Sequence, residues 1–106
     1  MIKLEFYVPV ESAEKVKNAL FDAGAGKIGN YDRCSWETSG TGQFRPGSES
    51  NPAIGEKGKL TRLEELKIEM VCEDKIIDSV IDALKTTHPY ETPAYQHWKV
   101  GKPLNH

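Results

Sequence analysis

Apolar and polar residues alternate at the start of the chain, and the same alternation returns further along it. In the segment 3–8 every second residue is apolar, namely Leu4, Phe6 and Val8. The segment 67–72 repeats the pattern 64 residues later, with Ile68, Met70 and Cys72 in the matching places. A period of two is typical of a β-strand with one buried face. The pattern therefore predicts two half-buried strands.

A stripe of apolar residues at helical spacing follows each of these strands. The first stripe comes after Pro9 and consists of Ala13, Val16, Ala19, Leu20 and Ala23. The second consists of Ile76, Ile77, Val80, Ile81 and Leu84. Such spacing predicts two amphipathic helices. Ser12 and Asp74 are the expected N-caps, Gly24 is the expected stop of the first helix, and His88-Pro89 ends the second.

A further strand is expected after each helix, at Tyr31–Thr38 and at Ala94–Val100. The common offset of 64 residues also relates Tyr31 to Tyr95, which supports this placement. The alternative is a chance similarity between two amphipathic units.

Two β-α-β units, about 2–38 and 66–100, predict the order βαββαβ. This is the ferredoxin-like arrangement, an α+β sandwich with a four-stranded antiparallel sheet and two helices on one face. A long loop of about 39–60, rich in Gly, Pro, Ser and Asn, joins the second strand to the third. Loops of this length are functional or disordered. Its Phe44-Arg45 pair could reach a ligand or a neighbouring subunit.

Composition narrows the class of protein. The 106 residues suffice for one domain, 1–106. With 14 basic and 16 acidic residues the net charge is −2, which argues against a nucleic-acid partner. The apolar runs are too short for a membrane span, and the first residues do not form a signal peptide. Two cysteines, Cys34 and Cys72, fit a reduced cytoplasmic chain.

Neither of two familiar motifs indicates a function here. Gly24–Gly29 matches G-x-G-x-x-G, but a helix precedes it and a strand follows, which is the reverse of a dinucleotide site. The expected third strand, 65–72, lacks the aromatic residues of an RNA-binding sheet. The sequence shows no catalytic signature, and we expect Glu64 and Glu65 to lie on the solvated surface. An enzymatic site could then arise only by combining residues of several subunits.

The turn His88-Pro89-Tyr90-Glu91-Thr92-Pro93 has two interpretations. His88 and Glu91 could bind a metal or a polar ligand, or His88 could cap the helix while Tyr90 packs. A soft-metal site would need His88, Glu91, His97 and Cys34 to converge, because a metal requires three or four ligands. Cys72 falls on a buried strand face, and the terminal His106 is expected to fray.

Four segments resemble the YqfO family: 24–36, 38–46, 51–55 and 88–95. In larger members, the NIF-three-like proteins, this module looks like an insert within a two-metal-binding domain, whereas here we expect it to stand alone. The turn 88–93 also resembles that of CutA proteins. The resemblance implies the fold of CutA and of the PII signalling proteins. The 106 residues do not include the flanking domain with its metal ligands, and the loop lacks the PII nucleotide-binding pattern.

The resemblance further implies a homotrimer that binds ligands in clefts between subunits, beside the loop. The leading hypothesis is a non-enzymatic PII/CutA-like module that binds a small ligand or a protein partner. Its candidate binding residues are Thr38, Gly40, Gly42, Gln43, Phe44, Arg45, His88, Tyr90 and Glu91. The two glycines would allow close backbone approach, Gln43 would offer amide hydrogen bonds, and Arg45 would pair with an anion. Because CutA proteins are linked to divalent-cation tolerance, the alternative is binding of copper or another divalent metal ion by His88, Glu91, His97 and Cys34.

Overall fold

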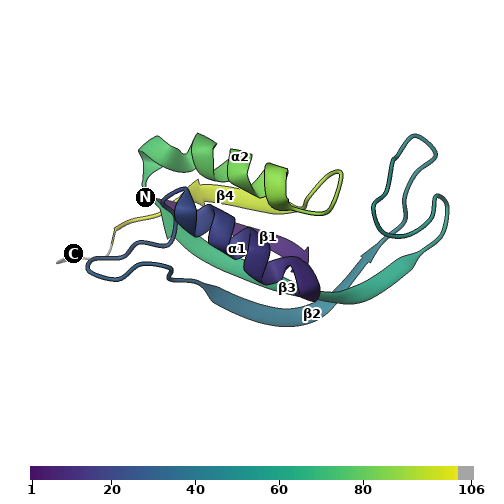
Figure 1. The fold of residues 1–106 in the computed structure, drawn as a ribbon, viewed down its shortest axis with the longest axis horizontal. Helices are drawn as coiled ribbons and strands as arrows, with labels where there is room; N and C mark the ends of the chain where they lie inside the picture. The colour runs from purple at the N-terminus through teal and green to yellow at the C-terminus, as the bar shows by residue number, and fades with distance from the viewer. Residues whose placement is uncertain (103–106) are drawn as a thin grey trace.

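Four strands form one antiparallel sheet in the order β2-β3-β1-β4, and both helices lie on the same side of it (Figure 1). The computed structural model describes residues 1–102, so the expectation for His106 lies outside the described residues. The elements are β1 (Ile2–Pro9), α1 (Ala13–Asp22), β2 (Trp36–Phe44), β3 (Thr61–Cys72), α2 (Ile77–Thr87) and β4 (Tyr95–Lys99), with a short 3₁₀ turn before each helix. The predicted ferredoxin-like fold is confirmed.

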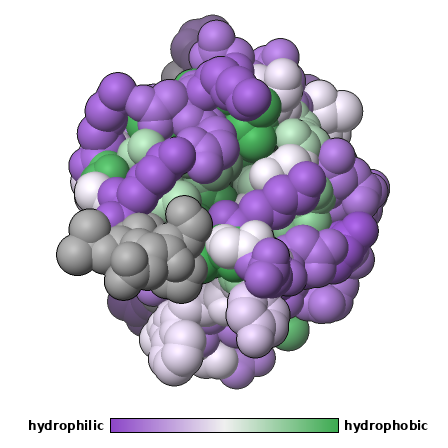
Figure 2. All heavy atoms as spheres, turned by 90° about the vertical axis from the view of Figure 1, so that its left-hand side faces the viewer, coloured by the Kyte–Doolittle hydropathy of each residue, from purple (hydrophilic) through white to green (hydrophobic). Residues whose placement is uncertain are grey.

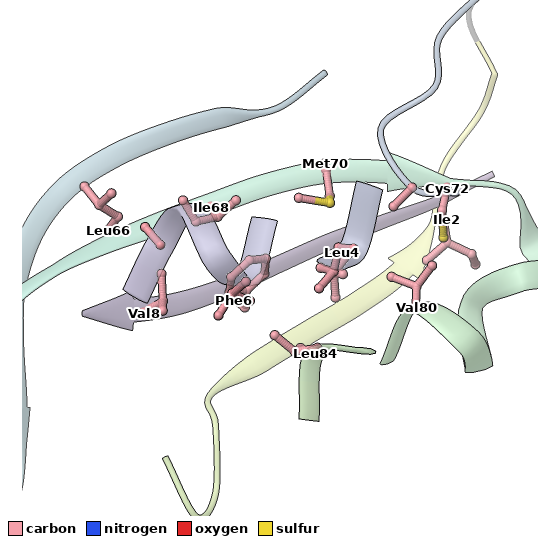
Figure 3. Close-up of a cluster of buried hydrophobic side chains, with 14 residues drawn as sticks. Ile2, Leu4, Phe6, Val8, Leu66, Ile68, Met70, Cys72, Val80 and Leu84 are labelled. Atoms are coloured by element: carbon pink, nitrogen blue, oxygen red, sulfur yellow. The ribbon is translucent and has the colours of Figure 1, made fainter. Parts of the chain in front are cut away.

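The core lies between the sheet and the two helices (Figure 3). The strand alternation explains its composition: Leu4, Phe6 and Val8 of β1 are buried together with Ile68, Met70 and Cys72 of β3. The helices contribute the residues of their apolar stripes, above all Val16, Leu20, Val80 and Leu84. The two predicted periodicities therefore meet in one buried layer.

The N-cap prediction holds for the first helix and is wrong for the second. Ser12 occupies the N-cap position of α1, although its side chain makes no capping hydrogen bond. The N-cap of α2 is Ile76, because the 3₁₀ turn Asp74–Ile76 places Asp74 two residues earlier. The carboxylate of Asp74 forms ion pairs with Lys99 and with the N-terminal ammonium group. Gly24 follows α1 with a φ of 107°, so the glycine stop was predicted correctly.

The strand after the first helix was misplaced in the sequence analysis. β2 begins at Trp36 rather than at Tyr31, and Tyr31 lies 76% exposed in a tight turn where it pairs with Ile28. β2 also continues to Phe44, and β3 begins at Thr61. The connection is therefore 45–60, shorter than the expected 39–60. The hairpin of β2 and β3 projects beyond the helices (Figure 1).

The other face of the sheet carries charged residues, and neither helix of the described chain lies over it. Lys3 pairs with Glu69 at 3.5 Å, and Lys67 pairs with Glu5 at 3.3 Å. Trp36, on the edge strand β2, is 69% exposed and stands opposite Glu69. The uncovered face thus combines neutralised charges with a large exposed aromatic ring.

Both ends of the described chain lie at one end of the sheet (Figure 1). Ile2 pairs with Lys99, and the N–H of Val100 donates to the carbonyl of Met1 at 3.0 Å. Seen from this end, the surface is mainly hydrophilic, with apolar atoms visible between the polar groups (Figure 2). Among residues 1–102, no helix has the length and apolar character needed to cross a membrane.

Candidate functional site

A pocket of about 310 Å³ lies where the turn after α2 meets the end of β2 and the loop 45–60. Its walls are largely apolar and aromatic, formed by Tyr7, Phe44, Pro46, Pro52, Ile54 and Tyr90. Two carboxylates, Glu65 and Glu91, also line it. Volumes near 300 Å³ are at the lower end of the range for small-molecule sites.

A second hollow of about 430 Å³ continues from this pocket along β2. The two share Tyr7, Gln43, Glu65 and Ala94, so they form one groove with an apolar end and a more polar end. Thr38, Ser39, Thr41 and Lys67 line the polar end. We call the whole depression the β2 groove.

Glu65 stands at the junction of the two ends and is 9% exposed. The Tyr90 hydroxyl donates a hydrogen bond of 2.5 Å to its Oε2. Burial, together with the neighbouring Glu65 carboxylate, raises the pKa of Tyr90, which keeps the phenol protonated as a donor. On the other side the carboxylate rests against Gly42, where any Cβ atom would collide with it. Gly42 is therefore required for this close approach.

His88 is a structural residue rather than an open ligand. It is 6% exposed, its Nε2 lies 2.6 Å from the carbonyl of Tyr7, and its Nδ1 accepts the N–H of Tyr90 at 3.1 Å. The neutral Nε2–H tautomer satisfies both bonds, and burial lowers the pKa of His88. Its backbone N–H caps α2 by donating to Leu84, and its ring packs on Tyr90. The interpretation in which His88 caps the helix and Tyr90 packs is the one the structure supports.

The other candidate residues divide between the groove and the solvent. Gln43, Phe44, Tyr90 and Glu91 line the apolar end, while Thr38, Gly40 and Gly42 line the polar end. Arg45 is exposed and lines neither end. A Cβ atom added at Gly40 would meet no other atom within 4 Å, so no neighbouring group requires a glycine at this position.

Two hydrogen bonds hold the walls of the groove. The carboxylate of Glu91 accepts the backbone N–H of Asn51 at 3.0 Å and so ties the loop 45–60 to the turn after α2. The amide oxygen of Gln43 accepts the guanidinium N–H of Arg62 at 2.7 Å. Both side chains are thus partly engaged within the protein.

The four residues of the metal hypothesis are not gathered within one chain. Both ring nitrogens of His88 are occupied, and Glu91 is bound to the loop. Cys34 lies after α1, where its thiol contacts the carbonyl of Asp32 at 3.6 Å, and His97 is exposed on β4. In the part of the chain that the structure describes, no three His, Cys, Asp or Glu side chains could hold a metal ion.

The sequence analysis overlooked Glu65, which it assigned to the solvated surface. The alternation of Glu65, Lys67 and Glu69 does place all three on the uncovered face of the sheet. Glu65 is buried where the turn after α2 contacts it, because Tyr90 of that turn donates a hydrogen bond to the carboxylate. That long-range contact has no counterpart in the local pattern.

No family model matches the chain, but curated relatives do. Proteins named "GTP cyclohydrolase 1 type 2 homolog" are 45% identical over 93 residues in Listeria innocua, 42% over 101 residues in Mycobacterium tuberculosis and 42% over 98 residues in Bacillus subtilis. These matches cover 87%, 95% and 92% of this chain and 25%, 27% and 26% of the relatives. The chain therefore spans about a quarter of the length of the curated relatives it matches.

Solved structures with the same fold include relatives of the same kind. A Bacillus cereus protein related to NIF3 superposes with a TM-score of 0.76 at 43% identity, over 92% of this chain and 24% of that one. CutA1 from Pyrococcus horikoshii superposes with a TM-score of 0.70 at 20% identity, over 99% of this chain and 88% of that one. The second likeness shows a shared fold over nearly all of this chain and most of the other.

Proposed function

Because the chain belongs to the NIF3/YqfO family, in which it corresponds to one segment of the longer members, we propose that it is a PII/CutA-like binding module. The module assembles into a homotrimer in the cytoplasm and takes up a small ligand or a protein partner in clefts between subunits. The relatives named GTP cyclohydrolase 1 type 2 homolog are proteins of which this chain covers about a quarter. The function proposed for this chain is accordingly ligand or partner binding, and not the enzymatic activity that the name of the relatives describes.

The β2 groove is the observation that carries this proposal. It brings together residues far apart in the sequence, such as Phe44 of β2 and Tyr90 of the turn, whose ring centroids are 5.5 Å apart. It combines apolar walls with a few polar groups, which is the usual composition of a ligand site. Seven of the nine predicted binding residues line it.

The position of the groove supports a cleft between subunits. Its polar end runs along β2, which is an edge strand of the sheet and pairs only with β3 among the described strands. Residues 36–41 of β2 are all exposed. An edge strand offers unpaired backbone groups to another chain. A second subunit lying along β2 would add a wall to the groove. Trp36 at the start of this strand offers the kind of aromatic surface that interfaces prefer.

Sedimentation of the full chain across the micromolar range tests the assembly. We expect a trimer, and we expect Trp36→Ala to shift dissociation to higher protein concentration because it removes exposed aromatic surface from the uncovered face. Tyr31→Ala is the matched control, since Tyr31 is similarly exposed but lies in the loop after α1. A chain that remains monomeric throughout this range contradicts the proposal.

A further inference from the structure

Glu65 differs from the other acidic residues of the same sheet face in having no cation beside it. Glu5 and Glu69 are neutralised by lysines on the neighbouring strand. The residues opposite Glu65 are Pro9 on β1 and Gly40 on β2, neither of which carries a charge. Among residues 1–102, Glu65 is the buried carboxylate, and it takes part in no ion pair there.

The hydrogen bonds of Glu65 are also incomplete. Its Oε2 accepts the Tyr90 hydroxyl, a neutral donor, and within the described residues its Oε1 receives no hydrogen bond. A buried carboxylate is stable when a cation or several donors compensate for the lost water. One phenol provides part of this compensation. Within the described residues, Oε1 is therefore free to accept a further hydrogen bond from a group that enters the groove.

The surroundings of Glu65 suit a cation attached to an apolar body. Tyr7, Phe44 and Tyr90 place aromatic rings around the apolar end of the groove, and Glu91 adds a second carboxylate. Aromatic faces attract ammonium groups. Within the described part of the chain, no lysine or arginine lines this end. Lys67 lines the polar end, where its ammonium group pairs with Glu5.

We propose that the apolar end of the β2 groove binds a small organic amine, whose ammonium group pairs with Glu65 while its apolar body packs among Phe44, Tyr90 and the prolines of the loop 45–60. This deepens the proposed function by naming the chemical class of its ligand, and it rests on the same groove. A volume of about 310 Å³ favours a small molecule over a folded partner. The amine supplies the charge and the donor that the protein leaves out at Glu65.

A matched series of probes tests the proposal on the full chain. Phenethylamine, 2-phenylethanol and phenylacetate share an aromatic ring but carry a cation, a neutral hydroxyl and an anion. Binding is followed by calorimetry and by the amide resonances of the protein. We expect phenethylamine to bind about tenfold or more tightly than the alcohol, and the anion to bind least, because a hydrogen bond to a charged group outweighs a neutral one.

Two variants locate the interaction. Glu65→Gln keeps the side-chain shape and an acceptor for Tyr90 but removes the charge, and it should reduce the preference for the amine by about tenfold. Glu64→Gln makes the same chemical change at the neighbouring exposed position and should leave the preference unchanged. The probe series in the unaltered protein remains decisive if Glu65→Gln does not fold.

Equal binding of the amine and the alcohol overturns the inference, as does an amine preference that survives in Glu65→Gln. Absence of binding by all three probes to an oligomeric protein also overturns it, while the proposed oligomeric module stands. A monomeric protein that binds the amine through Glu65 gives the opposite result. In that case the amine site is retained and the trimeric module is rejected.

Discussion

Two buried polar side chains at the groove, His88 and Glu65, are accommodated in different ways. The ring of His88 has a partner for each nitrogen, so burial leaves it neutral and fully bonded. The carboxylate of Glu65 has one phenolic donor and a glycine beside it. A fully satisfied group fixes the local structure, whereas a partly satisfied one leaves capacity for a ligand.

Gly42 sets the position of the Glu65 carboxylate, and a methyl group there should be costly. We expect Gly42→Ala to lower the free energy of unfolding by about 1–3 kcal/mol relative to Gly40→Ala, because either the carboxylate or the backbone must move. Urea denaturation of both variants measures the difference.

Gly40→Ala is the control for this comparison, since a Cβ atom there meets nothing within 4 Å. It should leave stability unchanged or raise it slightly, because alanine loses less chain entropy than glycine in a strand. Equal stability of the two variants would show that the carboxylate moves aside freely.

At the level of elements, the sequence predicted what local periodicity controls and missed what pairing controls. The spacing of apolar residues predicts both helices and the strands β1 and β3. The residues that these elements bury in the core are those expected. The stretch 39–43 contains two glycines, a serine and a threonine, and it was therefore interpreted as the start of a loop. It forms a strand because β3 extends back to Thr61 and pairs with it along its full length. Tertiary pairing thus overrides a weak local preference.

The same limit applies to the candidate site. Its residues on β2 and in the turn were identified by their unusual composition, and the structure brings most of them to one groove. Glu65 could not be identified, because its burial depends on Tyr90, 25 residues away. The metal hypothesis assumed that four side chains meet in space, which their spacing in the sequence does not indicate. These side chains are His88, Glu91, His97 and Cys34.

Asp74 joins the start of α2 to β4 and to the first residue of the chain, and this gives a pH dependence. The hydrogen bond from Lys99, and then that from the N-terminal ammonium group, lower the pKa of Asp74 from 3.8 to about 2. Since the pKa is lower in the folded state, the contribution is complete above about pH 4 and disappears as the pH falls towards 2. We therefore expect Asp74→Asn to be less stable than the unaltered protein at pH 7, with the gap closing between pH 4 and pH 2.

Denaturant titrations across this pH range measure the gap. Asp82→Asn is the control, because Asp82 is exposed on α2 and its carboxylate forms no ion pair among residues 1–102. A gap for Asp74→Asn that stays constant from pH 7 to pH 2 would contradict the assignment.

At the level of the whole molecule, one buried layer holds two helices against one side of the sheet, and the other side is left uncovered. A domain of about this size has a net stability of roughly 5–15 kcal/mol, so single core residues matter. The predicted duplication accounts for the first strand and helix of each half, which obey the offset of 64 residues. The strands after the helices do not obey it, since β2 starts at Trp36 and β4 at Tyr95.

Truncation of the core should be severe, whereas truncation of a surface leucine should not. Leu84 is fully buried, and we expect Leu84→Ala to cost about 2–5 kcal/mol in unfolding free energy through the cavity it leaves. Leu60→Ala should change stability by less than about 0.5 kcal/mol, since Leu60 is 55% exposed. Both are measured at one protein concentration, because assembly contributes to apparent stability. Similar losses for the two would contradict the assigned core.

The pairing of Ile2 with Lys99 has a consequence for the way this fold connects to other polypeptide. Strands paired in this way lie about 5 Å apart, so the chain enters and leaves the fold at nearly the same point in space. A surface turn of a host protein could open at one peptide bond and receive the whole unit without separating its own flanking residues. The entropy of closing the host around it would be small, because the two junctions are already adjacent. The pairing of β1 with β4 thus holds the two ends of the fold together, so that the fold could be inserted as a unit into another protein.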